Sequence, residues 1–310
     1  MLTVYTYLSP NENSSETDDR LTPHKSAVNS RKRSSPNGSL SEYEQRAEVI
    51  FRIDPHGKFL RFNKDNHVVS HLMVNFSRAM AVYENRPDTF REFVQPHQTL
   101  TLTGTEKDIL TLSRPRQKVL DFIEELALSV RYVPDWGWIY EEGMDWQEQE
   151  EMVDLYVSRV EWLFHQRDRL NIGNVEFIPL AKGLHRAHYE LAADTYDQLG
   201  VDRIAVYVGQ TRSLNKIIRR VEQAIEVFDP SGVLVIGRQA PNEVADLPQR
   251  VDGVAGLRNW KSACNLTADG YSSEALITWY NKVKNALQGG QAHRQIGLDF
   301  ATAGRVSTDG

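Results

Sequence analysis

The sequence contains almost no cysteine and no long apolar run. Cys264 is the only cysteine among 310 residues, which excludes an internal disulfide and a multi-cysteine zinc site. No apolar run approaches the roughly 20 residues that span a bilayer. The first eight residues also lack the pattern of a secretory leader. These absences predict a soluble, cytoplasmic protein with no membrane partner.

Familiar cofactor and metal motifs are missing as well. The chain has no Gly-x-Gly-x-x-Gly after an expected strand, no Gly-Lys-Ser/Thr loop and no Gly-x-Ser-x-Gly elbow. His185 and His188 stand three residues apart, but no third metal ligand is suggested nearby. Cys264 has no local histidine partner and is expected to be a small core residue. We therefore expect no metal and no cofactor.

The charge balance is mildly acidic, with a formal net charge of −6. This argues against a wholesale binder of polyanions, although the 36 Lys and Arg residues leave a local basic groove open. Hydrophobic residues make up 40% and charged residues 25%, as is typical of a globular protein.

Composition divides the chain into a tail, a domain and a second tail. Residues 9–46 are rich in Ser, Asn, Pro and charge, so they cannot bury enough surface to offset their ordering entropy. We expect residues 1–46 to be a disordered tail, 47–288 to be one folded domain and 289–310 to be a flexible C-terminal tail. A domain of this length suits a single barrel.

The first ordered segments predict a small N-terminal β-hairpin. Residues 49–53 are expected to form one strand, residues 54–57 (Asp-Pro-His-Gly) a turn, and residues 58–62 (Lys-Phe-Leu-Arg-Phe) a second strand. Beyond the hairpin, the patterns predict helices at 67–84 and 117–128 and short strands at 100–102 and 109–112.

From Arg131 the pattern becomes a regular alternation of strands and helices. The strands are short, apolar and β-branched, as strands buried on both faces should be. A strand–helix–strand series predicts parallel pairing, which an open doubly wound sheet or a closed barrel satisfies. The lack of phosphate loops favours an α/β protein with a (β/α) TIM-like barrel. The expected strands are 131–133, 175–180, 203–208, 233–236 and 251–257, and the helices are 147–170, 185–199, 213–228 and 242–247.

Barrel enzymes carry their active sites at the carboxyl ends of the strands. In this chain those ends are polar, glycine-bearing or aromatic, which suits an anionic or hydrogen-bonding ligand and a flat group stacked on tryptophan. The candidate residues are Asp135, Trp136, Trp138, Lys182, Gly183, Gly209, Gln210, Arg238, Arg258 and Trp260.

Each candidate has a structural alternative. Asp135 is either a base or base-recognising acceptor, or a group that fixes a Pro-Asp turn. Lys182 holds a phosphate or carboxylate, or points to solvent. Arg238 and Arg258 bind phosphate, or form ordinary surface ion pairs. Trp136 is either a stacking platform or a packed lid.

Four stretches resemble the tRNA-guanine transglycosylase superfamily, in particular its divergent queuine/archaeosine and DNA 7-deazaguanine transglycosylase-like members. They are 132–135 (Tyr-Val-Pro-Asp), 177–183 (Phe-Ile-Pro-Leu-Ala-Lys-Gly), 189–209 and 251–260 (Val-Asp-Gly-Val-Ala-Gly-Leu-Arg-Asn-Trp). The resemblance covers residues 131–263, less than half of the chain. It implies a (β/α) barrel that exchanges guanine for a 7-deazaguanine base in DNA or tRNA through an aspartate attached to the ribose.

The resemblance also implies roles for single residues. Asp135 matches a base-recognising acid, Lys182 and Gly183 match a Gln-Gly pair that contacts the base, and Gly209 matches a glycine of the base pocket. The nucleophilic aspartate should lie a few residues before Trp260, where the chain has Ala and Gly. Neither the Asp-Ser-Gly-Gly-Phe motif nor the zinc cysteines of the family are present. Asp252 or Asp108 is then the candidate replacement.

Three functions follow from these patterns. The first is a transglycosylase-like protein that exchanges or recognises a guanine or 7-deazaguanine base in DNA or tRNA. The second is a catalytically inactive barrel that serves as a nucleic-acid-binding partner subunit. The third is an unrelated barrel hydrolase or lyase on a small anionic substrate, with Asp135, Glu141 or Asp252 in acid–base roles. The sequence leaves a homodimer open.

Overall fold

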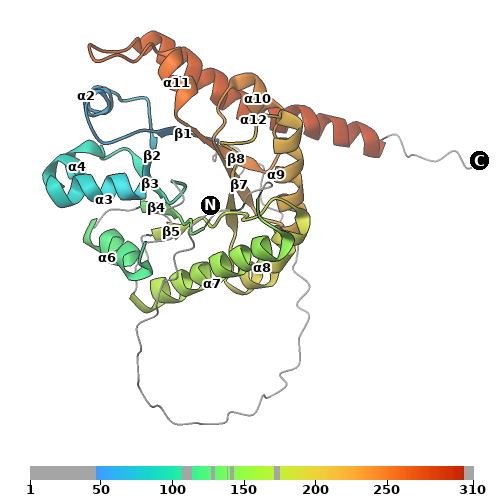
Figure 1. The fold of residues 1–310 in the computed structure, drawn as a ribbon. Coiled ribbons are helices and arrows are strands. Elements are labelled where there is room, and N and C mark those ends of the chain that lie inside the picture. Colours follow the sequence, from blue (N-terminus) through green and yellow to red (C-terminus); the bar gives the residue numbers. More distant parts are fainter. Residues whose placement is uncertain are drawn as a thin grey trace, which may run out of the picture. The chain divides into compact units, whose positions relative to one another are not determined.

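The computed structural model describes residues 47–106, 114–126, 130–137, 139, 143–170 and 175–303. Eight parallel strands form one sheet in the order β5-β4-β3-β2-β1-β8-β7-β6 (Figure 1). Their bounds are β1 (Glu48–Arg52), β2 (His71–Asn75), β3 (Thr99–Thr103), β4 (Val130–Val133), β5 (Val175–Phe177), β6 (Arg203–Tyr207), β7 (Gly232–Ile236) and β8 (Val251–Gly256).

At least one helix follows each strand, which confirms the predicted α/β class (Figure 1). The helices are α2 (Lys58–Lys64), α3 (Phe76–Asn85), α4 (Pro87–Phe93), α6 (Arg116–Leu126), α7 (Trp146–Leu170), α8 (Arg186–Gln198), α9 (Leu214–Phe228), α10 (Pro241–Ala245), α11 (Arg258–Ala263) and α12 (Ser273–Ala303).

The first and last strands are neighbours, so the sheet curls on itself. β1 pairs in parallel with β2 on one side and with β8 on the other. The two edges of the sheet meet just beyond β5, where Leu180 forms a parallel bridge with Ala205 of β6. The Ala205 N–H donates to the Pro179 carbonyl at 2.8 Å. The result is a barrel-like parallel sheet whose strands all end on the same side.

Side chains alternate between the two faces of β1. Phe51 points toward the helices, with its ring 5.0 Å from that of Trp260. Glu48 and Arg52 lie on the opposite face, where they bond side chains of β6 and β2. The outer face of the sheet therefore joins the apolar core under the helices, while the inner face carries polar groups near both ends.

The predicted N-terminal hairpin is wrong. Residues 58–64 form helix α2, and both partners of β1 are parallel to it. Phe59 and Phe62 are three residues apart, so a helix places both on one face. Their rings lie 6.1 and 4.8 Å from that of Trp260. The sequence alternation fits a strand or a helix, and this aromatic packing selects the helix.

The segment 67–84 is not the single helix expected either. Residues 71–75 form β2, and α3 begins at Phe76. The strand exists because β1 and β3, both distant in sequence, pair with it. The other predicted strands and helices are confirmed to within a few residues, whereas α11 and α12 were not predicted. Residues 109–112, Asp108, Trp138 and Glu141 lie outside the described residues.

Candidate functional site

A cavity of about 130 Å³ opens beyond the ends of β4, β5 and β6. This is the end of a parallel barrel at which active sites occur. Asp135, Lys182, Gly183 and Gln210, all predicted from the sequence, come together here. The other residues that line the cavity are Thr105, Glu106, Gly137, Ile139, Leu180, Ala181, Leu184, Tyr207, Thr211 and Arg220.

An ion pair joins the segments that follow β4 and β5. The Lys182 ammonium donates to Asp135 Oδ1 at 2.6 Å and to the Gly137 carbonyl at 2.8 Å. The two side chains are only 11% and 12% exposed, so water screens the pair weakly. The ammonium also lies 5.5 Å from the centre of the Tyr156 ring. The cavity therefore has a fixed acceptor and a fixed donor side by side.

The backbone of Asp135 rests directly on Gly104, at the end of β3. A Cβ atom at Gly104 would come within 2.6 Å of the Asp135 backbone nitrogen and 3.1 Å of its Cβ. Only glycine allows the chain after β3 to come this close. Gly104 thus determines how deep Asp135 lies in the cavity.

Glu106 is a second carboxylate on the cavity wall. It forms an ion pair of 3.1 Å with Arg114, and both side chains are 3% exposed. It also accepts a hydrogen bond of 2.7 Å from the Ser77 N–H, near the start of α3. Sequence reasoning missed Glu106, although Gly104-Thr105-Glu106 is a polar strand end of the same kind as the others.

Arg220, on α9, ties two cavity loops together. Its guanidinium donates to the Gly183 carbonyl at 3.0 Å and to Thr211 Oγ1 at 3.3 Å. Its Nε is buried and finds no partner in the described part of the chain. Gly183 has a φ of 136° and lies against His188, where a Cβ atom would come within 2.3 Å of the histidine Cβ. The loop around Gly183 is therefore held from both sides.

Gly209, predicted at the site, is not among the residues that line the cavity and lies against Tyr207. A Cβ atom at Gly209 would come within 2.6 Å of the Tyr207 hydroxyl. Tyr207 lines the cavity and interacts with Arg52, on β1. Burial lowers the pKa of Arg52, while Tyr207 and Glu106 act in the opposite direction.

Besides Gly209 and Asp252, four predicted residues do not line the cavity. Trp136 and Trp260 are fully buried, and Trp260 packs between Phe51 and Phe62 in the core under the helices. Arg238 donates to the Thr211 carbonyl at 2.6 Å and pairs with Glu243 on α10 at 3.2 Å. It positions the loop after β6. Arg258 is exposed at the start of α11.

Asp252 lies at the far end of the sheet from Asp135. It is the second residue of β8, four residues before that strand ends, a distance of roughly 13 Å along the strand. Its Oδ1 accepts hydrogen bonds from Arg203, at the start of β6, at 2.9 and 3.2 Å. Asp135 instead follows the end of β4. The two aspartates therefore do not share a site.

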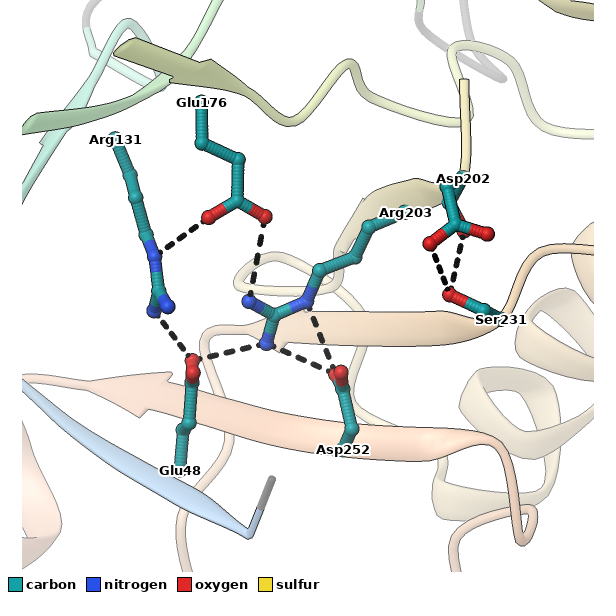
Figure 2. Close-up of polar contacts among 7 residues, drawn as sticks. All are labelled: Glu48, Arg131, Glu176, Asp202, Arg203, Ser231 and Asp252. Atoms are coloured by element: carbon teal, nitrogen blue, oxygen red, sulfur yellow. Dashed lines mark hydrogen bonds and ion pairs between the residues drawn. The ribbon is translucent and has the colours of Figure 1, made fainter. Parts of the chain in front are cut away.

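Asp252 belongs to a buried ion network at the beginnings of the strands. Figure 2 shows Arg203 between Glu48, Glu176 and Asp252, with Arg131 linking the two glutamates. Burial lowers the pKa of Arg203, but Asp252 and Glu48 outweigh burial and raise it. Burial likewise raises the pKa of Glu48, but Arg203 and Arg131 outweigh it and lower the pKa. We therefore assign the network a structural role, separate from the cavity.

Among the described residues we looked for a metal site and a membrane-spanning helix and found neither. The part of the chain that the structure describes has no group of three His, Cys, Asp or Glu side chains placed to hold a metal ion. Nor does any of its helices combine the length and apolar character needed to cross a bilayer. His188 accepts a hydrogen bond from the Leu184 N–H and stacks on Trp146.

Comparison with known proteins identifies no family for this chain. No protein-family model matches the sequence. A search of curated proteins finds no significant match either.

Proposed function

We propose that the protein is a closed (β/α) barrel that binds a purine-type base, of the guanine or 7-deazaguanine kind, in the cavity beside Asp135 and Lys182. The Leu180–Ala205 bridge supports closure, because it joins edge strand β6 to the segment that follows the other edge strand, β5. The buried Asp135–Lys182 pair is the observation that supports the ligand class most strongly. The resemblance of residues 131–263 to transglycosylases points to the same class.

The pair presents a pattern complementary to one edge of guanine. That edge has two N–H donors next to the O6 acceptor. A carboxylate is acceptor-only, and an ammonium is donor-only. Asp135 can therefore accept from the ring N–H and the amino group while Lys182 donates to O6. Adenine offers one N–H donor beside a ring-nitrogen acceptor, so the carboxylate would lose one of the two hydrogen bonds that guanine gives it.

The size of the cavity also favours a single base. Sites for drug-sized ligands measure roughly 300–1,000 Å³, whereas this cavity measures about 130 Å³. Its apolar wall includes Leu180, Ile139 and Leu184, against which a flat ring can pack. A base that is flipped out of a strand enters a pocket of this kind.

The described residues support recognition better than base exchange. Exchange through a covalent intermediate needs a nucleophile close to the base. The end of β8 carries Ala255 and Gly256, and Arg203 holds Asp252 at the opposite end of the sheet. A base-binding barrel without the transfer step, acting as a nucleic-acid-binding subunit, agrees with this arrangement.

A hydrolase or lyase acting on a small anionic substrate is the second candidate. Glu106 and Asp135 both line the cavity, and carboxylates in different environments can divide acid and base roles. Lys182 and Arg220 supply cations for an anionic group. Hydrolysis of 4-nitrophenyl phosphate or a 4-nitrophenyl glycoside by the wild type, abolished in Asp135→Asn, would favour this candidate.

Calorimetric binding of guanine and 7-deazaguanine tests the proposed function. The wild type should bind at least one of these bases, and Asp135→Asn should weaken binding by about tenfold or more, because an amide places a donor against a donor. Asp202→Asn is the matched control, since Asp202 bonds Ser231 before β6, at the other end of the sheet. Equal affinity of Asp135→Asn and wild type for the base would overturn the proposal.

A further inference from the structure

A second cavity, of about 190 Å³, opens between helix α2 and the loop 264–272, which joins α11 to α12. It shares no lining residue with the cavity beside Asp135. A single water needs only about 10–15 Å³ of such space, so this cavity has room for a small organic molecule. The residues that line it are Lys58, Arg61, Phe62, Asp65, Leu266, Thr267, Asp269, Gly270 and Tyr271.

Two cations of α2 tie the helix to the loop across this cavity. The Lys58 ammonium donates to the Leu266 carbonyl at 3.1 Å. Arg61, three residues later, donates to the Ala268 carbonyl at 3.0 Å. Each side chain has further donor hydrogens besides the one that these bonds use. The backbone of the loop therefore fixes both cations in the cavity wall while leaving them able to bind an anion.

The loop itself is held in shape by its own hydrogen bonds. The Thr267 N–H and hydroxyl both donate to the Gly270 carbonyl, at 2.9 and 3.2 Å. The Asp269 N–H donates to the Thr267 hydroxyl at 3.2 Å. At the base of the loop the Ser272 N–H donates to the Cys264 carbonyl at 2.8 Å. A wall that is ordered before a ligand arrives loses less entropy on binding.

The same cavity also carries two carboxylates, those of Asp65 and Asp269. In the described part of the chain, no ion pair joins either of them to Lys58 or Arg61. Opposite charges attract, but the cations are bonded to loop carbonyls instead. Charges of both signs therefore face one cavity without neutralising each other directly, and a ligand that carries both signs would complement them.

Below these charges the cavity has an aromatic floor. Phe62 is buried, and the Tyr271 ring lies 4.8 Å from it with the planes inclined by 64°. The Tyr271 hydroxyl donates to the Asp65 carbonyl at 3.3 Å, which holds the ring in place. An apolar floor with a few convergent polar groups is typical of small-molecule sites.

From these features we propose that the second cavity binds a small zwitterion, an α-amino acid with an apolar or aromatic side chain. The two cations of α2 hold the carboxylate, the two aspartates hold the ammonium, and the side chain packs on the aromatic floor. A simple anion would face the aspartates, and a simple cation would face Lys58 and Arg61. This inference goes beyond the base site and depends on none of its residues.

Isothermal titration calorimetry with L-phenylalanine and L-leucine tests the inference. The wild type should bind at least one of them with a Kd of about 1 mM or below. The amide of that amino acid lacks the carboxylate, and the acid without the amino group (3-phenylpropanoate or 4-methylpentanoate) lacks the ammonium. Each of these relatives should bind about fivefold more weakly or worse, because one set of charge-assisted hydrogen bonds is lost.

Two variants separate the roles of the charges. Arg61→Gln should weaken binding of the amino acid by about fivefold but leave binding of its amide unchanged. Asp269→Asn should weaken binding of the amino acid equally but leave binding of the deaminated acid unchanged. Lys64→Gln, on α2, and Asp154→Asn, on α7, are matched controls at exposed positions outside the cavity. They should bind as the wild type does.

Three results would contradict the inference. The first is the absence of binding by either amino acid at concentrations up to about 10 mM. The second is equal affinity of Arg61→Gln and Lys64→Gln for the amino acid. The third is displacement of the bound amino acid by guanine, which would place it in the cavity beside Asp135. Failure of guanine to bind at all would remove the proposed function but would leave this inference unaffected.

Discussion

Lys182 and Asp135 connect the ends of two neighbouring strands, with 2.6 Å between the ammonium nitrogen and the carboxylate oxygen. The contact lies in the cavity wall, beyond the ends of β4 and β5. It both holds two loops together and forms the polar wall of the cavity. A substitution at Lys182 should therefore affect stability and ligand binding together.

Lys182→Met removes the ammonium while keeping the length of the side chain. Because the Asp135 carboxylate is nearly buried, we expect the free energy of unfolding to fall by about 1–3 kcal/mol. Affinity for guanine should fall by about tenfold, since the donor to O6 is lost. Urea unfolding and calorimetry measure the two effects. Lys282→Met, at an exposed position, should change neither, and an unaltered base affinity in Lys182→Met would contradict the role given to the pair.

Gly104→Ala should displace Asp135 from its position. The added methyl group would lie 2.6 Å from the Asp135 backbone nitrogen, so the chain must shift. Overpacking of this kind costs about 1–3 kcal/mol, and base affinity should fall with it. Gly289→Ala is the control, because a Cβ atom there meets nothing within 4 Å. If both variants melt at the same temperature as the wild type, the close approach is not real.

Arg203→Met should be one of the most destabilising substitutions in the chain. It removes the partner of both Glu48 and Asp252 at a site where the arginine is 5% exposed. Breaking a buried ion pair from one side costs about 3–5 kcal/mol. Arg250→Met breaks the exposed pair with Asp229 and should cost about 0–1 kcal/mol. Similar losses in the two variants, measured by urea unfolding, would show that the network is not buried.

The same network predicts loss of stability in acid. The pKa of Glu48 in the folded protein lies below its ordinary value of 4.5, so the unfolded chain binds a proton more readily. The stabilisation from Glu48 is present above that value and is lost as the pH falls through the lower, folded pKa. Glu48→Gln should flatten the fall in melting temperature below about pH 4.5. An identical pH profile in the variant would refute this assignment.

His71 also lowers the stability of the protein in acid, but over a higher pH range than Glu48. Burial lowers its pKa below the ordinary value of 6.5, although Glu48 opposes the shift. The folded protein therefore holds the neutral form, and stability declines as the pH falls below 6.5. The variant His71→Gln should therefore lose less stability between pH 7 and pH 5, above the pH range in which Glu48 acts. Thermal melts across this range measure the loss.

Most strands and helices could be predicted because their patterns are local. Each strand from residue 130 onward is a short apolar run bounded by polar or glycine residues, and α9 repeats apolar residues with helical spacing. Residues 58–62 did not follow this rule, since their alternation suits a strand but Trp260 selects a helix. The contact with Trp260 joins residues about 200 positions apart, so no local sequence pattern could have predicted it.

The cavity could be predicted in part. Asp135 and Lys182 follow strands directly, so the barrel rule places them at the same end of the sheet. Glu106 and Arg220 were missed because one follows a threonine-rich strand and the other lies two turns into a helix. Asp252 and Trp260 were expected near the cavity. Asp252 lies near the start of its strand rather than at its end, and Trp260 faces the core instead of the cavity.

The sequence by itself determined the α/β class, the parallel direction of the strands from residue 130 onward and the strand ends that carry polar residues, because these depend on short-range periodicity. Only the tertiary structure decided which polar residues meet. Lys182 is 47 positions from Asp135, and Arg203 is 49 from Asp252, yet both distances are below 3 Å. Such pairs depend on the curl and register of the whole sheet, which set each side chain's height and face, and no single segment of the sequence contains that information.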